Sequence, residues 1–151
     1  MTEPEQGAGE QQLSGDDAEV IVRIILEHYP TAQAIYLFGT YGTEDARPDS
    51  DVDLAVLLPR AEAKQQRSLL LTPCHHALME ALDRPVDLLN AREVSTVAQM
   101  EIVAAERLLY CADEFAVAEF EMLTLSFYQK LNEERREIIE AFWETGRAYD
   151  V

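Results

Sequence analysis

The chain has 151 residues, 29 acidic against 12 basic side chains, and a formal net charge of −17. This length suffices for one domain with a single core and excludes a catalytic domain plus a separate substrate domain. The acidity argues against nucleic acid as the main partner, because polyanions are bound through clustered Lys and Arg.

The first ordered element is predicted after a polar tail. Residues 1–15 are rich in Glu, Gln and Gly, a composition typical of disorder. Asp16 and Glu19 resemble a capping pair, and the apolar residues that follow recur at helical spacing until Pro30. We therefore expect a disordered tail over residues 1–15 and then a helix that leads into the first strand.

Two β-prone segments follow, separated by a glycine turn and a loop. Residues 34–38 end directly at Gly39, and residues 52–58 form a second apolar run that stops at a proline. Because strand side chains alternate between faces, Asp51 and Asp53 are predicted to project to the same side. Their carboxylates suit a shared hard cation such as Mg²⁺.

Gly39 and Thr40 form a candidate phosphate-binding turn. A residue without Cβ lets backbone N–H groups approach phosphate oxygens, and the Thr40 hydroxyl adds a donor. The chain has no Gly-Lys-Ser/Thr sequence, so this is not a P-loop. The alternative is an ordinary turn before a solvated acidic loop, but the turn, its spacing and the apolar strand together favour the functional interpretation.

The following segment is predicted to alternate helix and strand. A helix is expected from residue 60 to about residue 82, kinked or divided at Pro73. Its adjacent His75 and His76 are interpreted as surface residues, since neighbours in a helix cannot chelate together. Beyond it we expect a strand, a helix and a short extended segment, over residues 85–89, 92–106 and 107–111.

The strand at residues 85–89 carries one acid, Asp87, where a strand packed on both faces would usually carry Val or Leu. Placed beside the second strand, Asp87 is positioned to act as general base for an attacking hydroxyl while Asp51 and Asp53 hold metal. The alternative is a strand-end residue that faces water.

From residue 113 the chain is predicted to be helical almost to its end. Six apolar residues fall at helical spacing and form a stripe: Phe120, Leu123, Phe127, Leu131, Ile138 and Phe142. A helix this long outruns a small domain, so residues 113–151 are expected to pack on the core and to offer a partner surface at the far end. A pair of helices broken near Asn132 and folded back on the core is the alternative.

The segment from Ala34 to Asp87 resembles the DNA polymerase β-type nucleotidyltransferase superfamily. The superfamily signature is hG[GS], a spacer, then Dh[DE]h, and it is matched by the runs LFGT at residues 37–40 and DVDL at residues 51–54. With a ten-residue spacer and a small chain, the sequence is identified as a member of the minimal nucleotidyltransferase (MNT) branch. This implies an α+β fold with a small mixed sheet flanked by helices, and a nucleotidyltransferase core over residues 16–112.

The resemblance also implies a function. Members of the MNT branch act as antitoxins beside HEPN-domain ribonuclease toxins, and some transfer AMP from ATP to a tyrosine of the toxin. Carried over, Gly39 and Thr40 match the phosphate-binding pair, Asp51 and Asp53 match the metal-binding acids, and Asp87 matches the third acid. The expected cofactor is Mg²⁺, with ATP as substrate.

The chain departs from the family pattern beside the glycine. Thr40 replaces the usual Ser and keeps the hydroxyl. The spacer lacks the basic residue that many relatives place directly after the Gly-Ser pair, and Arg47 is the candidate substitute for contacting the triphosphate. A solvated ion pair of Arg47 with Asp45 or Asp49 is the alternative.

The expected partner is a basic HEPN toxin in a hetero-oligomer, since the negative charge would accelerate such an encounter by electrostatic steering. No contact with nucleic acid or membrane is expected. Cys74 and Cys111 show no metal-ligand spacing, and no signal peptide or membrane span is visible, so we expect a cytoplasmic protein with free thiols. Two alternatives stay open: transfer to a small molecule such as an aminoglycoside, and neutralisation of the toxin by binding alone.

Overall fold

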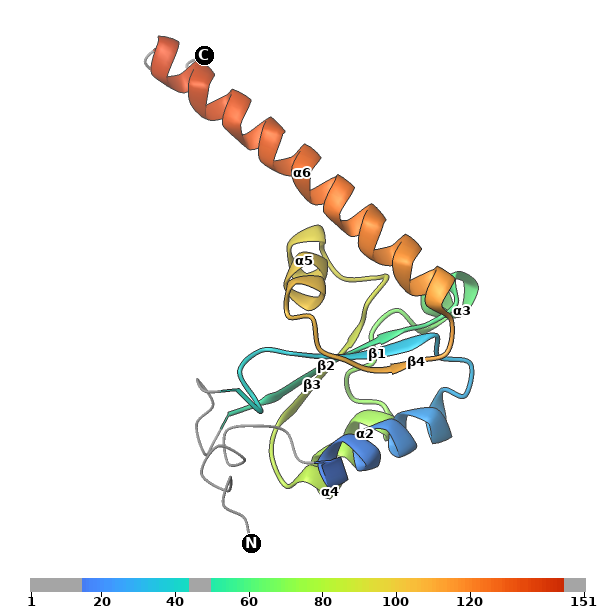
Figure 1. The fold of residues 1–151 in the computed structure, drawn as a ribbon. Helices are drawn as coiled ribbons and strands as arrows, with labels where there is room; N and C mark the ends of the chain where they lie inside the picture. The colour runs from blue at the N-terminus through green and yellow to red at the C-terminus, as the bar shows by residue number, and fades with distance from the viewer. Residues whose placement is uncertain (1–14, 44–49, 146–151) are drawn as a thin grey trace, which may run out of the picture.

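A computed structural model describes residues 15–43 and 50–145 of the chain, and within them a four-stranded mixed sheet is flanked by five helices (Figure 1). This confirms the predicted α+β class. The predicted tail, apart from Gly15, lies outside the described residues, and so does Arg47. The elements in chain order are α2 (Gly15–His28), β1 (Ala34–Phe38), β2 (Val52–Leu57), α3 (Arg60–Gln66), α4 (Pro73–Leu82), β3 (Val86–Asn90), α5 (Thr96–Ala104), β4 (Leu108–Cys111) and α6 (Glu114–Thr145).

The strands follow the order β3-β2-β1-β4 across the sheet. β1 runs antiparallel to both β2 and β4, while β2 and β3 are parallel. The register places Phe38 opposite Asp53 on one side and Asp87 opposite Asp53 on the other. Two of the three predicted acids are therefore direct neighbours across two strands.

Helices cover both faces of the sheet, α2 and α4 on one and α5 with the start of α6 on the other (Figure 1). Along β2, Val52, Leu54 and Val56 belong to the core cluster that includes residues of α2 and α4, whereas Ala55 and Leu57 belong to the cluster that includes residues of α5 and α6. Because neighbouring strand residues alternate, Asp53 faces the α5 side. This confirms the predicted separation of Asp53 from Val52 and Leu54.

The helix predicted over residues 60–82 is divided into α3 and α4. Pro73 is the first residue of α4, where a missing N–H costs nothing, and the Thr72 hydroxyl accepts a hydrogen bond of 3.2 Å from the His75 N–H. Between the helices, Arg67 and Leu71 have positive φ. The division was therefore predicted correctly, although the break begins six residues before the proline.

The surface interpretation is wrong for one of the two adjacent histidines. His75 is only 7% exposed; its Nδ1 accepts from the Leu71 N–H at 2.9 Å, and its Nε2 donates to the Val86 carbonyl at 2.6 Å. His76 is exposed and lies 3.3 Å from Glu80. The break before α4 turns His75 toward β3, which helical spacing alone does not reveal.

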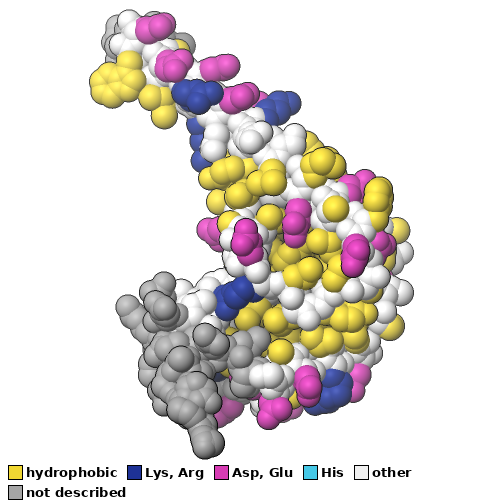
Figure 2. All heavy atoms as spheres, viewed as in Figure 1, with side chains coloured by type: hydrophobic (Ala, Val, Ile, Leu, Met, Phe, Trp, Pro, Cys, Tyr) yellow, Lys and Arg dark blue, Asp and Glu magenta, His cyan; other side chains and the backbone are white. Residues whose placement is uncertain are grey.

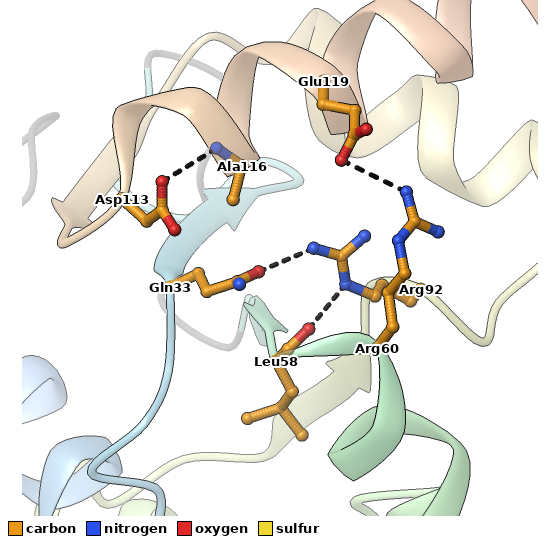
Figure 3. Close-up of polar contacts among 7 residues, drawn as sticks. All are labelled: Gln33, Leu58, Arg60, Arg92, Asp113, Ala116 and Glu119. Carbon is orange, nitrogen blue, oxygen red and sulfur yellow. Dashed lines mark hydrogen bonds and ion pairs between the residues drawn. The ribbon is translucent and has the colours of Figure 1, made fainter.

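α6 is one unbroken helix of 32 residues, so the alternative of two helices broken near Asn132 is wrong. Asp113 caps its first turn by accepting from the Ala116 N–H at 3.0 Å, and the pair of Arg60 of α3 with Glu119 at 3.2 Å ties this end of the helix to the core (Figure 3). Beyond Thr124 no side chain is buried up to residue 144, and the helix projects away from the sheet (Figure 1). None of the helices in the described residues is both long and apolar enough to cross a membrane.

Candidate active site

The glycine turn and the second aspartate of the Asp-x-Asp pair lie against each other at the end of β1. Gly39 has φ +76°, and a Cβ built on it would lie 2.0 Å from Asp53 Oδ2. A larger residue would be strained by the positive φ and would displace the Asp53 side chain. The spacing between glycine and aspartate in the sequence therefore reflects a direct contact between the turn and the carboxylate.

The charges of the three predicted acids interact at this end of the sheet. Burial, followed by the negative charges of Asp87, Asp51 and Glu101, raises the pKa of Asp53 from 3.8 to about 6, while Arg107 opposes the shift. Asp53 and Asp87 are partly buried, and Asp51 is exposed just before β2. The arrangement concentrates negative charge that a cation would neutralise.

The acidic group fits a cation that takes further ligands from its substrate. Within residues 15–43 and 50–145, no group of three or more His, Cys, Asp or Glu side chains is arranged to hold a metal ion by itself. Mg²⁺, however, is typically held by one or two carboxylates plus substrate phosphates. The oxygen donors of Asp51 and Asp53, and the repulsion that raises the pKa of Asp53, match that mode.

Arg107 is a site residue that the sequence reasoning missed. Its guanidinium donates to the Gly39 carbonyl at 2.7 Å and to the Tyr41 carbonyl at 2.6 Å, and its charge acts on Asp53. It reaches the turn because its own carbonyl accepts from the Leu37 N–H at 2.9 Å, next to the pairing of β4 with β1. The sequence shows a basic residue at the start of the last extended segment, but it does not show that this residue lies beside β1.

Arg84 contacts one residue before and one residue after the undescribed segment 44–49. It donates to the Ser50 carbonyl at 2.9 Å, and its guanidinium carbon lies 4.7 Å from the centre of the Tyr41 ring, a cation–π distance. The Tyr41 hydroxyl in turn donates to Asp17 of α2 at 2.8 Å. Arg84 therefore connects the glycine turn with the residue directly before Asp51.

The remaining predicted contacts are placed only in part. Thr40 is exposed in the turn, and its carbonyl accepts from the N–H and hydroxyl of Thr43 at 3.0 and 2.6 Å. Arg47 lies outside the described residues, so its predicted role stays a prediction.

Beside Arg107, a cavity of about 630 Å³ opens between β4, α5 and α6. This cavity is large enough for a small ligand.

The chain resembles a known family over most of its length. Residues 21–115 match the family described as Polymerase beta, Nucleotidyltransferase. Over 120 residues the chain is 32% identical to the protein adenylyltransferase MntA of Shewanella oneidensis, and the match covers 80% of this chain and 83% of that relative.

Solved structures with the same fold come from toxin–antitoxin complexes. A chain in the crystal structure of a toxin–antitoxin with AMP-PNP has a TM-score of 0.65 and 30% identity, covering 83% of this chain and 98% of that chain. A chain in the structure of tri-AMPylated Shewanella oneidensis HEPN toxin in complex with MNT antitoxin has a TM-score of 0.61 and 30% identity. The match covers 84% of this chain and 96% of that chain.

Proposed function

Because the chain belongs to the polymerase beta nucleotidyltransferase family, we propose that it is an antitoxin that transfers AMP from ATP to a hydroxyl of a HEPN-type ribonuclease toxin. The observation that carries the proposal is the contact of Gly39 with Asp53 beside Asp87, which joins the candidate phosphate-binding turn to the acids. A relative that is 32% identical to this chain is a protein adenylyltransferase, and a similar chain was solved with an AMPylated toxin. We take a tyrosine as the acceptor.

The glycine turn holds the triphosphate in this proposal. Gly39 leaves its backbone open to phosphate oxygens, and Thr40 supplies a hydroxyl. Arg107 keeps the turn in shape by binding the carbonyls of Gly39 and Tyr41, and its charge lies close enough to act on Asp53. We add Arg47 as a third phosphate contact, as expected from the sequence.

The reaction is an in-line displacement at the α-phosphorus of ATP. The acceptor hydroxyl oxygen forms a bond to that phosphorus, the bond to the bridging oxygen of the β-phosphate breaks, and pyrophosphate leaves with the electron pair. Asp87 takes the hydroxyl proton, because it is the acid on the outermost strand beside Asp53. Asp51 and Asp53, with Asp87, would hold Mg²⁺, which supplies charge neutralisation on the triphosphate when bound.

The proposal divides the chain into a catalytic core over residues 16–112 and a C-terminal helical segment over residues 113–151. The core is too small to enclose a separate acceptor domain, so the toxin itself must present the hydroxyl. We expect a basic toxin surface and no nucleic-acid binding, since this chain carries a net charge of −17. We place the complex in the cytoplasm, consistent with two free cysteines, Cys74 and Cys111.

The proposal is tested with ATP labelled on the α-phosphate and the HEPN-domain toxin that the proposal pairs with this chain, here called the cognate toxin. Label is expected on the toxin with the native chain and not with Asp51→Asn/Asp53→Asn, which removes two charges but keeps shape. Asp87→Asn is expected to lose transfer with a smaller loss of ATP binding, since Asp51 and Asp53 remain to hold the cation. Equal labelling by the native chain and the double variant would contradict the proposal.

The same assay separates the two alternative functions. A small-molecule transferase would label an aminoglycoside without any toxin present. An antitoxin that acts by binding alone would form the complex and leave the toxin unlabelled, and the double variant would protect cells from the toxin as well as the native chain does.

A further inference from the structure

The distal half of α6 carries an apolar face that nothing in the described chain covers. Thr124 is the last buried residue, and 21 residues of the helix follow it, a length of about 30 Å at the usual helical rise. Large apolar side chains are exposed along this stretch: Leu125 43%, Phe127 53%, Ile138 46%, Ile139 54%, Phe142 40% and Trp143 76%. An apolar surface of this extent on a projecting helix is typical of an interaction site.

This exposed face continues the face that is already packed. Near the core, Phe120 and Thr124 are buried, Leu123 and Phe127 border a cavity with Gln99 of α5, and Leu125 borders another with Met100. At about 3.6 residues per turn, Thr124 therefore points toward α5. Seven-residue steps from Thr124 give Leu131 and Ile138, and Phe142 lies one turn further.

Four of the five glutamates in the distal half lie on the opposite face. Four glutamates repeat at spacings of three and four: Glu133, Glu137, Glu140 and Glu144. By the same helical geometry they point away from the α5 side. Large apolar residues are thus concentrated on the inner side of α6, where helical spacing also places Arg135 between Leu131 and Ile138. In Figure 2, hydrophobic side chains lie along the side that overhangs α5, with Lys or Arg side chains between two groups of them.

Resting on the proposed function, we propose that this face, defined by Leu131, Ile138 and Phe142 and called the inner face of α6, docks a helix of the cognate toxin. A second copy of this chain is the less favourable occupant, because each copy carries a net charge of −17 and two would repel each other. A basic toxin is attracted instead, and a helix fits a stripe with spacings of seven and four.

The position of the inner face explains how the toxin would present its acceptor. The corner between α6 and α5 lies on the same side of the sheet as Asp53, and Glu101 of α5 acts electrostatically on that acid. The base of α6 is fixed by the Arg60–Glu119 pair and by the hydrogen bond of 3.0 Å from the Tyr36 hydroxyl to Glu121. A toxin held in the corner is therefore held at a set orientation toward the acids.

The test compares two double variants of the full chain that introduce the same residue on opposite faces. Ile138→Gln/Phe142→Gln alters the inner face, and Glu137→Gln/Glu140→Gln alters the outer face. All four residues are exposed. Both variants are therefore expected to have the melting temperature of the native chain and its affinity for an ATP analogue. Binding to the cognate toxin is measured by calorimetry, and self-association by sedimentation.

The inner-face variant is expected to bind the toxin roughly 100-fold more weakly, about tenfold for each large apolar side chain left without its contact, and the outer-face variant to change binding less than threefold. Equal affinity of both variants would overturn the proposal. A native chain that dimerises alone, with the inner-face variant monomeric, would overturn the choice of occupant. If the toxin binds through the inner face but never receives AMP, the docking surface stands and only the proposed transfer fails.

Discussion

Gly39 is the residue at which the turn and the acids depend on each other most directly. A methyl group there would meet the Asp53 carboxylate at 2.0 Å, and the positive φ of +76° favours glycine. Gly39→Ala is therefore expected to displace the carboxylate and lower the rate of AMP transfer by about 100-fold. Gly15→Ala, which meets nothing within 4 Å, is the matched control and should transfer at the native rate. Similar rates for both variants would show that the contact has no catalytic role.

A separate prediction concerns Arg107, which is expected to affect ATP binding through its hydrogen bonds to the glycine turn. Replacing it with Ala removes two charge-assisted hydrogen bonds to the carbonyls of Gly39 and Tyr41. Such bonds are worth about 1.5–3 kcal/mol each, so ATP affinity should fall by about tenfold or more, with Arg107→Lys intermediate. Titration with an ATP analogue measures the loss, and Arg23→Ala on the exposed surface of α2 is the control. Native affinity in Arg107→Ala would contradict this role.

The raised pKa of Asp53 predicts a pH dependence of stability in the absence of divalent cations. The folded state holds this proton up to about pH 6, whereas an unfolded aspartate loses it near its ordinary value of 3.8. Between these values the folded chain binds more protons, so the contribution of Asp53 to the free energy of unfolding falls as the pH rises and is constant above about pH 6. Asp53→Asn should melt above the native chain at neutral pH, and the gap should narrow toward pH 4. A gap that is the same at both pH values would contradict the shift.

At the scale of elements, α4 holds β3, and so Asp87, in place through a buried histidine. His75→Leu leaves the Leu71 N–H and the Val86 carbonyl without partners, each at a cost of about 1–3 kcal/mol. We expect the free energy of unfolding to fall by about 2–4 kcal/mol in denaturant titrations. The same substitution at exposed His76 should change it by less than about 0.5 kcal/mol. Equal effects at both positions would show that the buried hydrogen bonds do not stabilise the fold.

The strands and the face on which Asp53 lies could be predicted because each is encoded locally. Apolar runs end at Gly39 and at a proline, and Asp51 and Asp53 lie two residues apart, so strand geometry alone puts Asp53 on the face opposite Val52. The order of strands is not encoded in this way. Arg107 joins the turn only because β4 pairs with β1, a contact between segments about 70 residues apart in the chain.

Helix boundaries were less predictable, since they depend on packing. The break before Pro73 follows from positive φ at Arg67 and Leu71, and these residues carry no glycine-like signal in the sequence. Likewise, the stripe along α6 predicted a helix equally well with or without a break near Asn132. An amphipathic pattern states which face seeks apolar contact, but it does not state whether the contact comes from the same chain.

At the scale of the whole molecule, the small core and the projecting helix divide two tasks. The core brings Gly39, Asp53 and Asp87 to one end of the sheet, and α6 offers an apolar face at a fixed angle to it (Figure 1). The domain is too small to surround an acceptor. An antitoxin of this design would use its partner as both substrate and scaffold.

The most direct test of the central claim is the intact mass of the cognate toxin, followed over time with its ribonuclease activity in the presence of this chain, ATP and Mg²⁺. The account predicts stepwise increases by the mass of AMP, a loss of ribonuclease activity that follows the modified fraction and persists after the two proteins are separated, and neither change with Asp51→Asn/Asp53→Asn. A toxin that binds and loses activity while its mass stays constant, and that recovers on separation, would contradict it.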